Sequence, residues 1–362
     1  MKTLYGNNVL ITGGTGFVGS HVVRALMSRG ARVVVTYRAT DPESYFYKEK
    51  LDKKAICAIC DFCDFDRVVN IITRYEIDDI IHLGAQAIVS TAYANPREAV
   101  RTNVMGTVNI LEAVRLTKRI KRVVVASSDK AYGKMKLRGE QKRVLSRVFS
   151  QENSQGDPFL GAPLREPPAH IAFKNNDSYF ETDPLAGDHP YEASKSAADL
   201  VAQAYAKTYD LPIVITRFGN IYGPGDLNFN RIIPGIMKAA ITGEKLILRS
   251  DGTFVRDYVY VEDVVSGYLY LLDHFDKVRG EAFNISSNDS YSVIGLIKAC
   301  EKILTKHIPF IIANSQVNEI PYQHLSFEKI KKLGWKPKWM LEKVLKETYR
   351  WYQHQIQISN KQ

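Results

Sequence analysis

The sequence lacks long apolar runs. Its 362 residues contain no stretch of about 18 or more apolar residues, the length a membrane-spanning helix needs. The first residues, MKTLYGNNVLITGG, also lack the apolar stretch and small-residue cleavage site of a signal peptide. We therefore expect a cytoplasmic protein with no membrane partner.

Cysteine is scarce, with four residues in the chain. Three of them, Cys57, Cys60 and Cys63, form the cluster CAICDFC, and Cys-x2-Cys spacing occurs in zinc and iron–sulfur sites. Cys57 and Cys60, however, lie in or just after a predicted strand, whose successive side chains point to opposite faces. No second ligand pair follows in the sequence. We therefore expect reduced thiols and no metal site.

Acidic residues are fewer than basic ones, 39 against 49, so the net charge is +10. The positive charge is concentrated in residues 134–147 and 298–362. Such patches suit nucleic acid, an acidic membrane surface, an anionic small substrate or simply solvated helix faces. In LEKVLKETYRWY (341–352) the charges alternate with apolar residues, as in an amphipathic surface helix. A nucleic-acid partner is therefore not expected.

Short apolar segments alternate with helical patterns along the chain. Five apolar strands are expected at 8–12, 32–37, 55–59, 79–83 and 122–126. Helical patterns lie between these strands, including 66–75 and 96–118. After residue 190 the alternation resumes. We expect strands at 212–217, 246–249 and 281–285, and helices at 191–208, 231–241, 262–272, 292–304 and 340–354. Alternation of this kind predicts an α/β protein with a doubly wound parallel sheet. The connection 134–178 is unusually long, and we expect it to lie over the mouth of a functional site.

A glycine-rich turn follows the first predicted strand. The segment GGTGFVG holds Gly13, Thr15, Gly16, Phe17, Val18 and Gly19, and it opens a helix. Glycines at such a junction let backbone N–H groups approach a pyrophosphate at the helix N-terminus. This predicts a dinucleotide cofactor. Arg38, after the second strand, suits the 2′-phosphate of NADP, and Asp61-Phe62, after the third, could contact the adenine.

A second constellation joins Ser128, Tyr191 and Lys195. Tyr191 and Lys195 are one turn apart on a predicted helix, so both side chains share a face. A lysine beside a tyrosine favours the phenolate, and we expect it to lower the pKa of Tyr191 so that Tyr191 serves as a base. Ser128 follows the fifth strand, where the carboxyl ends of parallel strands form a cleft.

With these motifs the chain resembles the extended short-chain dehydrogenase/reductase family, in its nucleotide-sugar epimerase and dehydratase branch. Matching segments include HLGAQ (82–86), TNVMGTVNILEA (102–113), HPYEASKSAADL (189–200), RFGNIYGPGD (217–226), RDYVYVEDV (256–264) and LGWKP (333–337). The resemblance implies a Rossmann domain over residues 1–215, with 134–178 as an insertion. It also implies a smaller, interleaved domain over 216–362 that holds a nucleotide sugar.

The same resemblance implies tightly bound NAD or NADP and a homodimer built on helices near 96–116 and 191–208. It adds cofactor-binding residues, namely Leu83, Gly84, Ala85 and Asn103 beside Tyr191 and Lys195. It also implies substrate-binding residues, namely Gln86, Asn220, Arg231 and Arg256, of which the arginines suit a diphosphate.

Asp129 and Lys130 separate the two main activities of this branch. Ser128-Asp129-Lys130 is most similar to the Asp-Lys version found in CDP-glucose 4,6-dehydratases, although a surface turn pair is the alternative. In a dehydratase, Tyr191 takes the proton of the sugar 4-OH while Ser128 hydrogen-bonds that oxygen. Neutral Lys130, or another base, then removes the C5 proton, protonated Asp129 donates to the departing 6-OH, and the hydride returns to C6. An epimerase on the same scaffold and a non-catalytic dinucleotide-sensing protein are the competing hypotheses.

Overall fold

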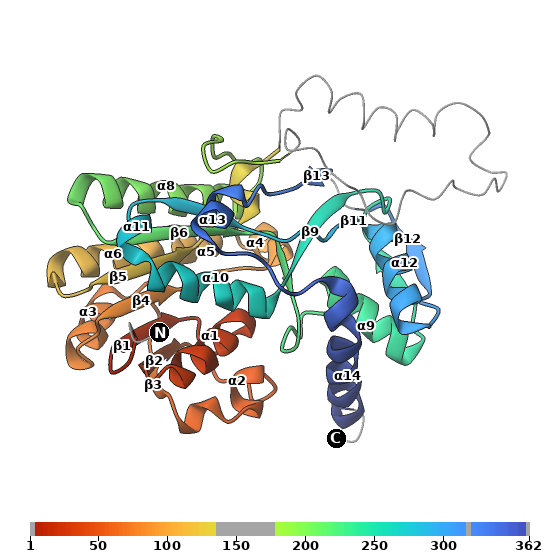
Figure 1. Ribbon diagram of the computed structural model, residues 1–362, viewed down its shortest axis with the longest axis horizontal. Helices are drawn as coiled ribbons and strands as arrows, with labels where there is room; N and C mark the ends of the chain where they lie inside the picture. The colour runs from red at the N-terminus through yellow and green to blue at the C-terminus, as the bar shows by residue number, and fades with distance from the viewer. Residues whose placement is uncertain (1–3, 135–177, 316–319, 360–362) are drawn as a thin grey trace.

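The computed structural model describes residues 4–134, 178–315 and 320–359. All of the insertion 134–178 except Lys134 and Ser178 lies outside these residues, and so does the prediction that it covers the site. The described residues form a larger lobe around one sheet and a second lobe of short strands and helices, at the left and right of Figure 1.

A parallel sheet of seven strands forms the centre of the larger lobe, in the order β10-β6-β5-β4-β1-β2-β3. Its strands are β1 (Asn8–Thr12), β2 (Arg32–Tyr37), β3 (Ile56–Ile59), β4 (Asp79–His82), β5 (Arg122–Ala126), β6 (Ile213–Phe218) and β10 (Ala282–Ile285). The order reverses between β1 and β4. In doubly wound sheets, ligands bind at such a reversal, outside the carboxyl ends of the strands.

Helices cover both faces of this sheet because its strands are apolar on both sides. In β1, Val9 and Ile11 pack toward α1 (Phe17–Ser28) and α10 (Val261–Asp273), whereas Leu10 packs toward the opposite layer. That layer consists of α3 (Phe65–Arg74), α6 (Gly106–Thr117) and α8 (Pro190–Tyr209). This alternation follows from the two-residue period of a strand, and it confirms the predicted Rossmann-type α/β class.

The predicted single helix 96–118 is divided into three parts. It begins as α5 (Pro96–Val100), passes through a π-helical turn η2 (Arg101–Met105) and continues as α6. Asn103 lies in the π-helical turn, and its side chain accepts from Gln86 N (2.7 Å) and donates to Ser194 Oγ (2.9 Å). The turn thus brings α8 and the segment after β4 together.

The second lobe consists of short strands and three longer helices. Its strands are β7 (Asn220–Tyr222), β8 (Leu246–Leu248), β9 (Val255–Tyr260), β11 (Ser290–Ser292), β12 (Phe310–Ile312) and β13 (Tyr322–Gln323). Strand β9 pairs with β7, β11 and β13, and β8 pairs with β12. The helices are α9 (Ile232–Thr242), α12 (Val293–Leu304) and α14 (Leu341–Ser359). Strand β10 returns to the large sheet from beyond residue 280, so the two lobes are interleaved in sequence; the boundary at residue 215 remains a prediction.

Shorter elements connect these parts. They are α2 (Tyr45–Lys48), η1 (Leu51–Lys53), α4 (Val89–Ala94), η3 (Asp129–Tyr132), α11 (Phe275–Val278) and α13 (Glu328–Leu333). No helix in the described part of the chain is long and apolar enough to cross a membrane.

Candidate active site

A cleft of about 840 Å³ lies between the two lobes, beyond the carboxyl ends of the large sheet. Ser128, Asp129, Lys130, Tyr191 and Lys195 all line it. The structure therefore brings together the five residues that the sequence assigned to catalysis.

The glycine turn is shaped for close backbone approach. Gly13 has φ +68°, and a Cβ on it would lie 2.9 Å from Gly84 Cα. A Cβ on Gly19 would lie 2.2 Å from Gly13 O. Helix α1 begins after Gly16, so no side chain caps its first N–H groups. These features fit a pyrophosphate bound at this helix N-terminus.

The other predicted cofactor residues lie at the ends of neighbouring strands. Phe17, Val18, Leu83 and Ala85 line the cleft. Arg38 reaches Glu98 (3.4 Å), and Asp61 forms an ion pair with Arg101 (2.9 Å). These two contacts place charged side chains at the ends of β2 and β3, where the adenosine half of a dinucleotide lies in Rossmann proteins.

Some of these residues are chiefly structural in the described chain. Phe62 is buried, and its ring lies where a Cβ on Gly84 or Gly106 would be. Gln86 does not line the cleft: its side-chain oxygen accepts from Ile88 N (2.8 Å), and its backbone is bound by Asn103. The prediction that Gln86 contacts substrate therefore has no support from its position.

Turn η3 directly follows the cleft end of β5. Ser128 Oγ donates to Asp129 Oδ1 (2.9 Å) and accepts from Lys130 N (3.2 Å). Asp129 is buried, whereas Lys130 is half-buried and its Nζ donates to Gln323 Oε1 on β13. The hydroxyl, carboxyl and amino groups of three consecutive residues thus converge on the cleft.

The pKa of Tyr191 differs from the expectation. Burial raises it to about 12, the Asp129 charge adds to the shift, and Arg231 and a hydrogen bond with Ser128 act in the opposite direction. Lys195 contributes no resolved lowering: its Nζ donates to Ala126 O (2.8 Å), and burial lowers its own pKa to about 8. The prediction that Lys195 lowers the pKa of Tyr191 is therefore wrong for the protein groups alone, because burial dominates, and the role of Tyr191 as a base stays a prediction.

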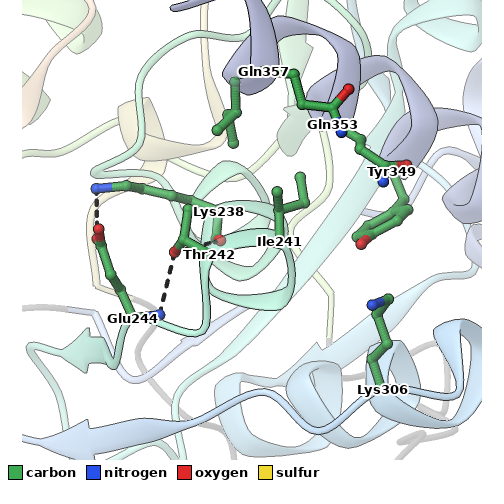
Figure 2. A pocket seen from close by; sticks show the side chains of 9 residues that line it. Lys238, Ile241, Thr242, Glu244, Lys306, Tyr349, Gln353 and Gln357 are labelled. Atoms are coloured by element: carbon green, nitrogen blue, oxygen red, sulfur yellow. Dashed lines mark hydrogen bonds and ion pairs between the residues drawn. The ribbon is translucent and has the colours of Figure 1, made fainter. Parts of the chain in front are cut away.

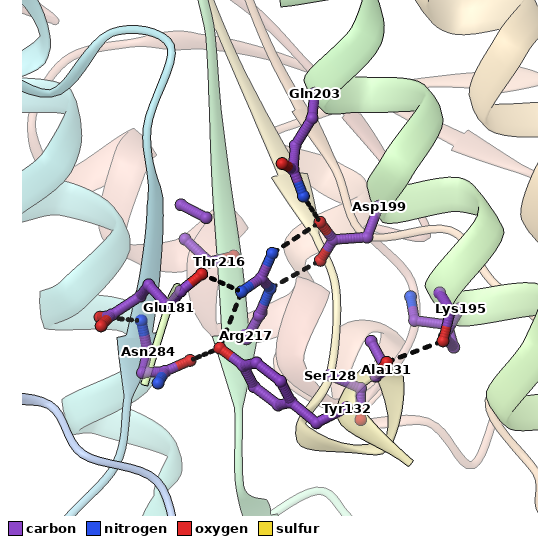
Figure 3. Close-up of polar contacts among 12 residues, drawn as sticks. Ser128, Ala131, Tyr132, Glu181, Lys195, Asp199, Gln203, Thr216, Arg217 and Asn284 are labelled. Atoms are coloured by element: carbon purple, nitrogen blue, oxygen red, sulfur yellow. Dashed lines mark hydrogen bonds and ion pairs between the residues drawn. The ribbon is translucent and has the colours of Figure 1, made fainter. Parts of the chain in front are cut away.

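A buried polar network supports the catalytic residues (Figure 3). Arg217 on β6 donates to both oxygens of Asp199 on α8 (2.8 and 2.9 Å). It also donates to the Tyr132 hydroxyl (2.7 Å), which in turn donates to Asn284 Oδ1 (2.7 Å). Because Asp199 lies on the helix of Tyr191 and Tyr132 ends η3, this network joins the two catalytic segments.

The second lobe lines the cleft with cationic side chains. Arg256 on β9 donates to Val255 O (2.8 Å), and Arg231 pairs with Asp226 (3.1 Å). Asn220 donates to Asp257 O (3.2 Å) and also lines the cleft. These three predicted substrate residues therefore lie on one wall, opposite Ser128 and Tyr191, where a diphosphate would meet positive charge.

Sequence reasoning missed several residues of the cleft. Ser127 Oγ is buried without a partner in the described chain and lines the cleft. Arg249, after β8, also lines it and donates to Asn230 O (2.9 Å). The adjacent Ser128 was a signal for Ser127, whereas nothing in the sequence placed Arg249.

A second hollow, of about 590 Å³, lies between α9 and α14 (Figure 2). Lys238 and Glu244 line both the hollow and the cleft, and they pair with each other at 2.8 Å. Among the described residues, no group of three or more His, Cys, Asp or Glu side chains could hold a metal ion.

Comparison with known families decides the relationship. The family model described as GDP-mannose 4,6 dehydratase matches residues 10–144, and that of the NAD dependent epimerase/dehydratase family matches residues 167–286. Both models describe nucleotide-sugar dehydratases and epimerases, so the chain is similar to this branch of the extended short-chain dehydrogenases/reductases in both lobes. The predicted resemblance and the fold class are thus confirmed.

Curated relatives of this family match almost the whole chain. A trifunctional UDP-glucose 4,6-dehydratase/epimerase/reductase of Arabidopsis thaliana is 28% identical over 95% of this chain and 47% of its own length. The chain thus spans about half the length of such plant relatives. The dTDP-glucose 4,6-dehydratase of Neisseria gonorrhoeae is also 28% identical, over 97% of each chain.

Solved structures of the family include both activities. The dTDP-glucose 4,6-dehydratase of Bacillus anthracis in complex with NAD is 25% identical, with a TM-score of 0.76 over 96% of this chain and 97% of that one. The UDP-glucose 4-epimerase of Thermotoga maritima with UDP-glucose is 25% identical, with a TM-score of 0.77 over 96% and 99%. The fold that the sequence predicts is therefore shared with nucleotide-sugar enzymes of both activities.

Proposed function

We propose that the protein is an NAD(P)-dependent NDP-hexose 4,6-dehydratase, nearest to the CDP-glucose type. The observation that carries this proposal is the position of Asp129 and Lys130, which lie beside Ser128 and Tyr191 in the same cleft. A 4-epimerase needs no further acid and base there, whereas a dehydratase needs both.

The chain's own residues divide the reaction into two parts. A bound dinucleotide supplies reversible hydride acceptance, and the glycine turn and the lining residues Phe17 and Val18 would hold it. Tyr191 takes the proton of the sugar 4-OH, and Ser128 hydrogen-bonds the same oxygen. Oxidation at C4 acidifies the C5 proton, which Lys130 removes, while Asp129 protonates the departing 6-OH. The hydride taken from C4 then returns to C6, so that the sugar loses water without net oxidation. Arg231 and Arg256 hold the diphosphate.

The epimerase remains the second candidate because an epimerase structure matches the fold as well as a dehydratase structure does. Incubation with a panel of CDP-, UDP-, dTDP- and GDP-hexoses, followed by mass spectrometry, separates them. We expect a product lighter by one water. An isomer of unchanged mass would favour the epimerase, and dinucleotide binding without any conversion would favour the sensing protein.

We also propose a homodimer in which α6 and α8 face a second copy. Apolar side chains are exposed on these helices and on the turn before α6, namely Met105, Leu116, Leu200 and Tyr209. Leu200→Glu should convert the dimer to a monomer in analytical ultracentrifugation. Ile312→Glu, at an exposed apolar residue on β12, is the control and should leave the dimer intact.

A further inference from the structure

Lys130 contacts a residue from the other lobe. Its Nζ donates a hydrogen bond to Gln323 Oε1, across a separation of 193 residues in sequence. Lys130 lies on η3 at the end of the large sheet, and Gln323 lies on β13 of the second lobe. The amino group proposed to act on the sugar is thus held from outside the Rossmann lobe.

Strand β13 is fixed in place by the strand beside it. Gln323 pairs in register with Arg256 on β9, and Leu325 N, just after β13, donates to Asp257 Oδ2 (2.8 Å). Asp257 also accepts from Ser286 Oγ (2.9 Å). Because its strand is bound on both sides of the residue, the Gln323 amide meets Lys130 from a rigid support.

Only one of the two polar atoms of the Gln323 side chain, Oε1, has a hydrogen-bond partner among the described residues. The side chain is 1% exposed, and its Nε2 is buried with no hydrogen-bond partner in the described chain. Burying an unpaired amide N–H disfavours folding, and an apolar side chain of similar size would avoid that cost. The contribution of a glutamine here is therefore the contact of its oxygen with Lys130.

We propose that Gln323 is a positioning residue, which holds the Lys130 amino group toward the cleft and sets the pH range in which Lys130 acts as a base. This inference rests on the proposed dehydratase function. An amide oxygen accepts from both the ammonium and the neutral amine, so it orients Lys130 without trapping its proton. A carboxylate at the same place would favour the ammonium, which cannot take the C5 proton.

Other charged and titratable groups line the same cleft as Lys130 and are present in every variant below. They include Asp129 on the same turn, Tyr191 and Lys195 on α8, Arg231 before α9, Arg256 on β9, and Lys238, Glu244, Lys245 and Arg249 from α9 to β8. Because they are unchanged, a shift between variants reports the atom that replaces Gln323 Oε1.

The test compares Gln323→Glu and Gln323→Met with the wild type. The rate of water loss from an NDP-hexose is measured against pH with the full chain and its cofactor. In Gln323→Glu the rise of the rate with pH should move to higher pH by about one unit or more, since an added negative charge favours the ammonium. In Gln323→Met it should move to lower pH, with a maximal rate several-fold lower because Lys130 loses its contact with the second lobe.

The chain offers a matched control. Lys48 Nζ donates to Gln355 Oε1, a similar lysine–glutamine contact on α14 that is remote from the cleft. Gln355→Glu should leave the pH profile unchanged. The midpoint of thermal unfolding should not fall in Gln323→Met, whereas a purely structural glutamine would lower it.

The outcomes separate this inference from the proposed function. Water loss in the wild type with superimposable pH profiles in both Gln323 variants overturns the inference and leaves the function standing. A shift in the same direction in both variants also overturns it, because a charged and an apolar replacement then act alike. If the wild type releases no water from any NDP-hexose, the function fails and the role of Gln323 fails with it.

Discussion

The two walls of the cleft are built differently. On the Rossmann side, Tyr191 and Lys195 are buried, and the network of Arg217 supports them with the arginine side chain only 1% exposed. On the side of the second lobe, the arginines reach into the cleft, and the Arg231 side chain is 40% exposed. The wall that performs chemistry is buried and supported by the Arg217 hydrogen-bond network, whereas Arg231 on the wall that binds charge is more exposed.

Of the variants that separate the two walls, Tyr191→Phe should lower turnover most, because it removes the group that accepts the 4-OH proton. We expect turnover to fall by about 10²–10⁴-fold, with no reduced cofactor formed. The measurement is absorbance of the reduced dinucleotide after mixing with substrate. Lys130→Met is the matched variant: it should allow the first oxidation, so that reduced cofactor accumulates. Full dehydration by Lys130→Met would remove Lys130 from the mechanism.

Arg217→Met should destabilise the protein strongly, since it leaves Asp199 buried without its cation. Breaking such a pair costs about 3–5 kcal/mol. The control is Lys331→Met on α13, where the pair with Glu328 is exposed and worth about 0–1 kcal/mol. Denaturant unfolding compares the two. Equal losses would show that the buried wall does not depend on the Arg217 network.

Arg256→Met should act on binding alone. Loss of charged hydrogen bonds to a diphosphate, worth about 1.5–3 kcal/mol, raises KM by about 10–10²-fold at nearly constant kcat. Steady-state kinetics with the preferred NDP-hexose measure this, and exposed Arg74 on α3 gives the control Arg74→Met. A fall in kcat with unchanged KM would place Arg256 in the chemistry instead.

The smallest expected effect concerns His82 and the way the free energy of unfolding depends on pH. It is fully buried at the end of β4 between Thr12 Oγ1 (2.7 Å) and Thr107 Oγ1 (3.2 Å), and burial lowers its pKa to about 3. The unfolded chain therefore binds one more proton than the native one below about pH 6.5, so stability falls as the pH drops from there toward 3. The slope is at most about 1.4 kcal/mol per pH unit.

His82→Gln should reduce this fall in the free energy of unfolding at acidic pH, measured by urea unfolding at several pH values. The control His307→Gln, at an exposed histidine, should leave the fall unchanged. A wild-type stability that is constant between pH 6.5 and 4, after correction for the carboxylates, would contradict a neutral His82.

Much of this architecture could be predicted because its signals are local. The glycine turn, the five apolar strands of the first half and the Tyr191–Lys195 spacing lie within short segments, and the structure places them as expected. Strand β9 was missed because VRDYVY carries Arg256 and Asp257, yet every residue in it is buried. The Asp257 carboxylate is satisfied by partners far away in sequence, Ser286 and Leu325.

The properties of the site depended on such distant partners as well. The spacing of Tyr191 and Lys195 correctly predicted their proximity but not the burial that dominates the pKa of Tyr191. Likewise, the π-helical turn at Asn103 depends on Gln86 and Ser194, and no pattern within residues 96–118 contains them. Gln323 lies in a two-residue strand, which is too short to show a period.

The return of β10 to the large sheet has a consequence for synthesis on the ribosome. Strand β6 acquires its outer neighbour only after residues 282–285 have emerged, and by then β7, β8 and β9 have already been made. Until that moment β6 presents an open edge, which is a template for pairing with another nascent chain. A fragment that stops at residue 215 would keep this edge permanently, cut off from Phe218 and from Asn284. The full chain, and not its first half, is therefore the unit that folds without an exposed edge at β6.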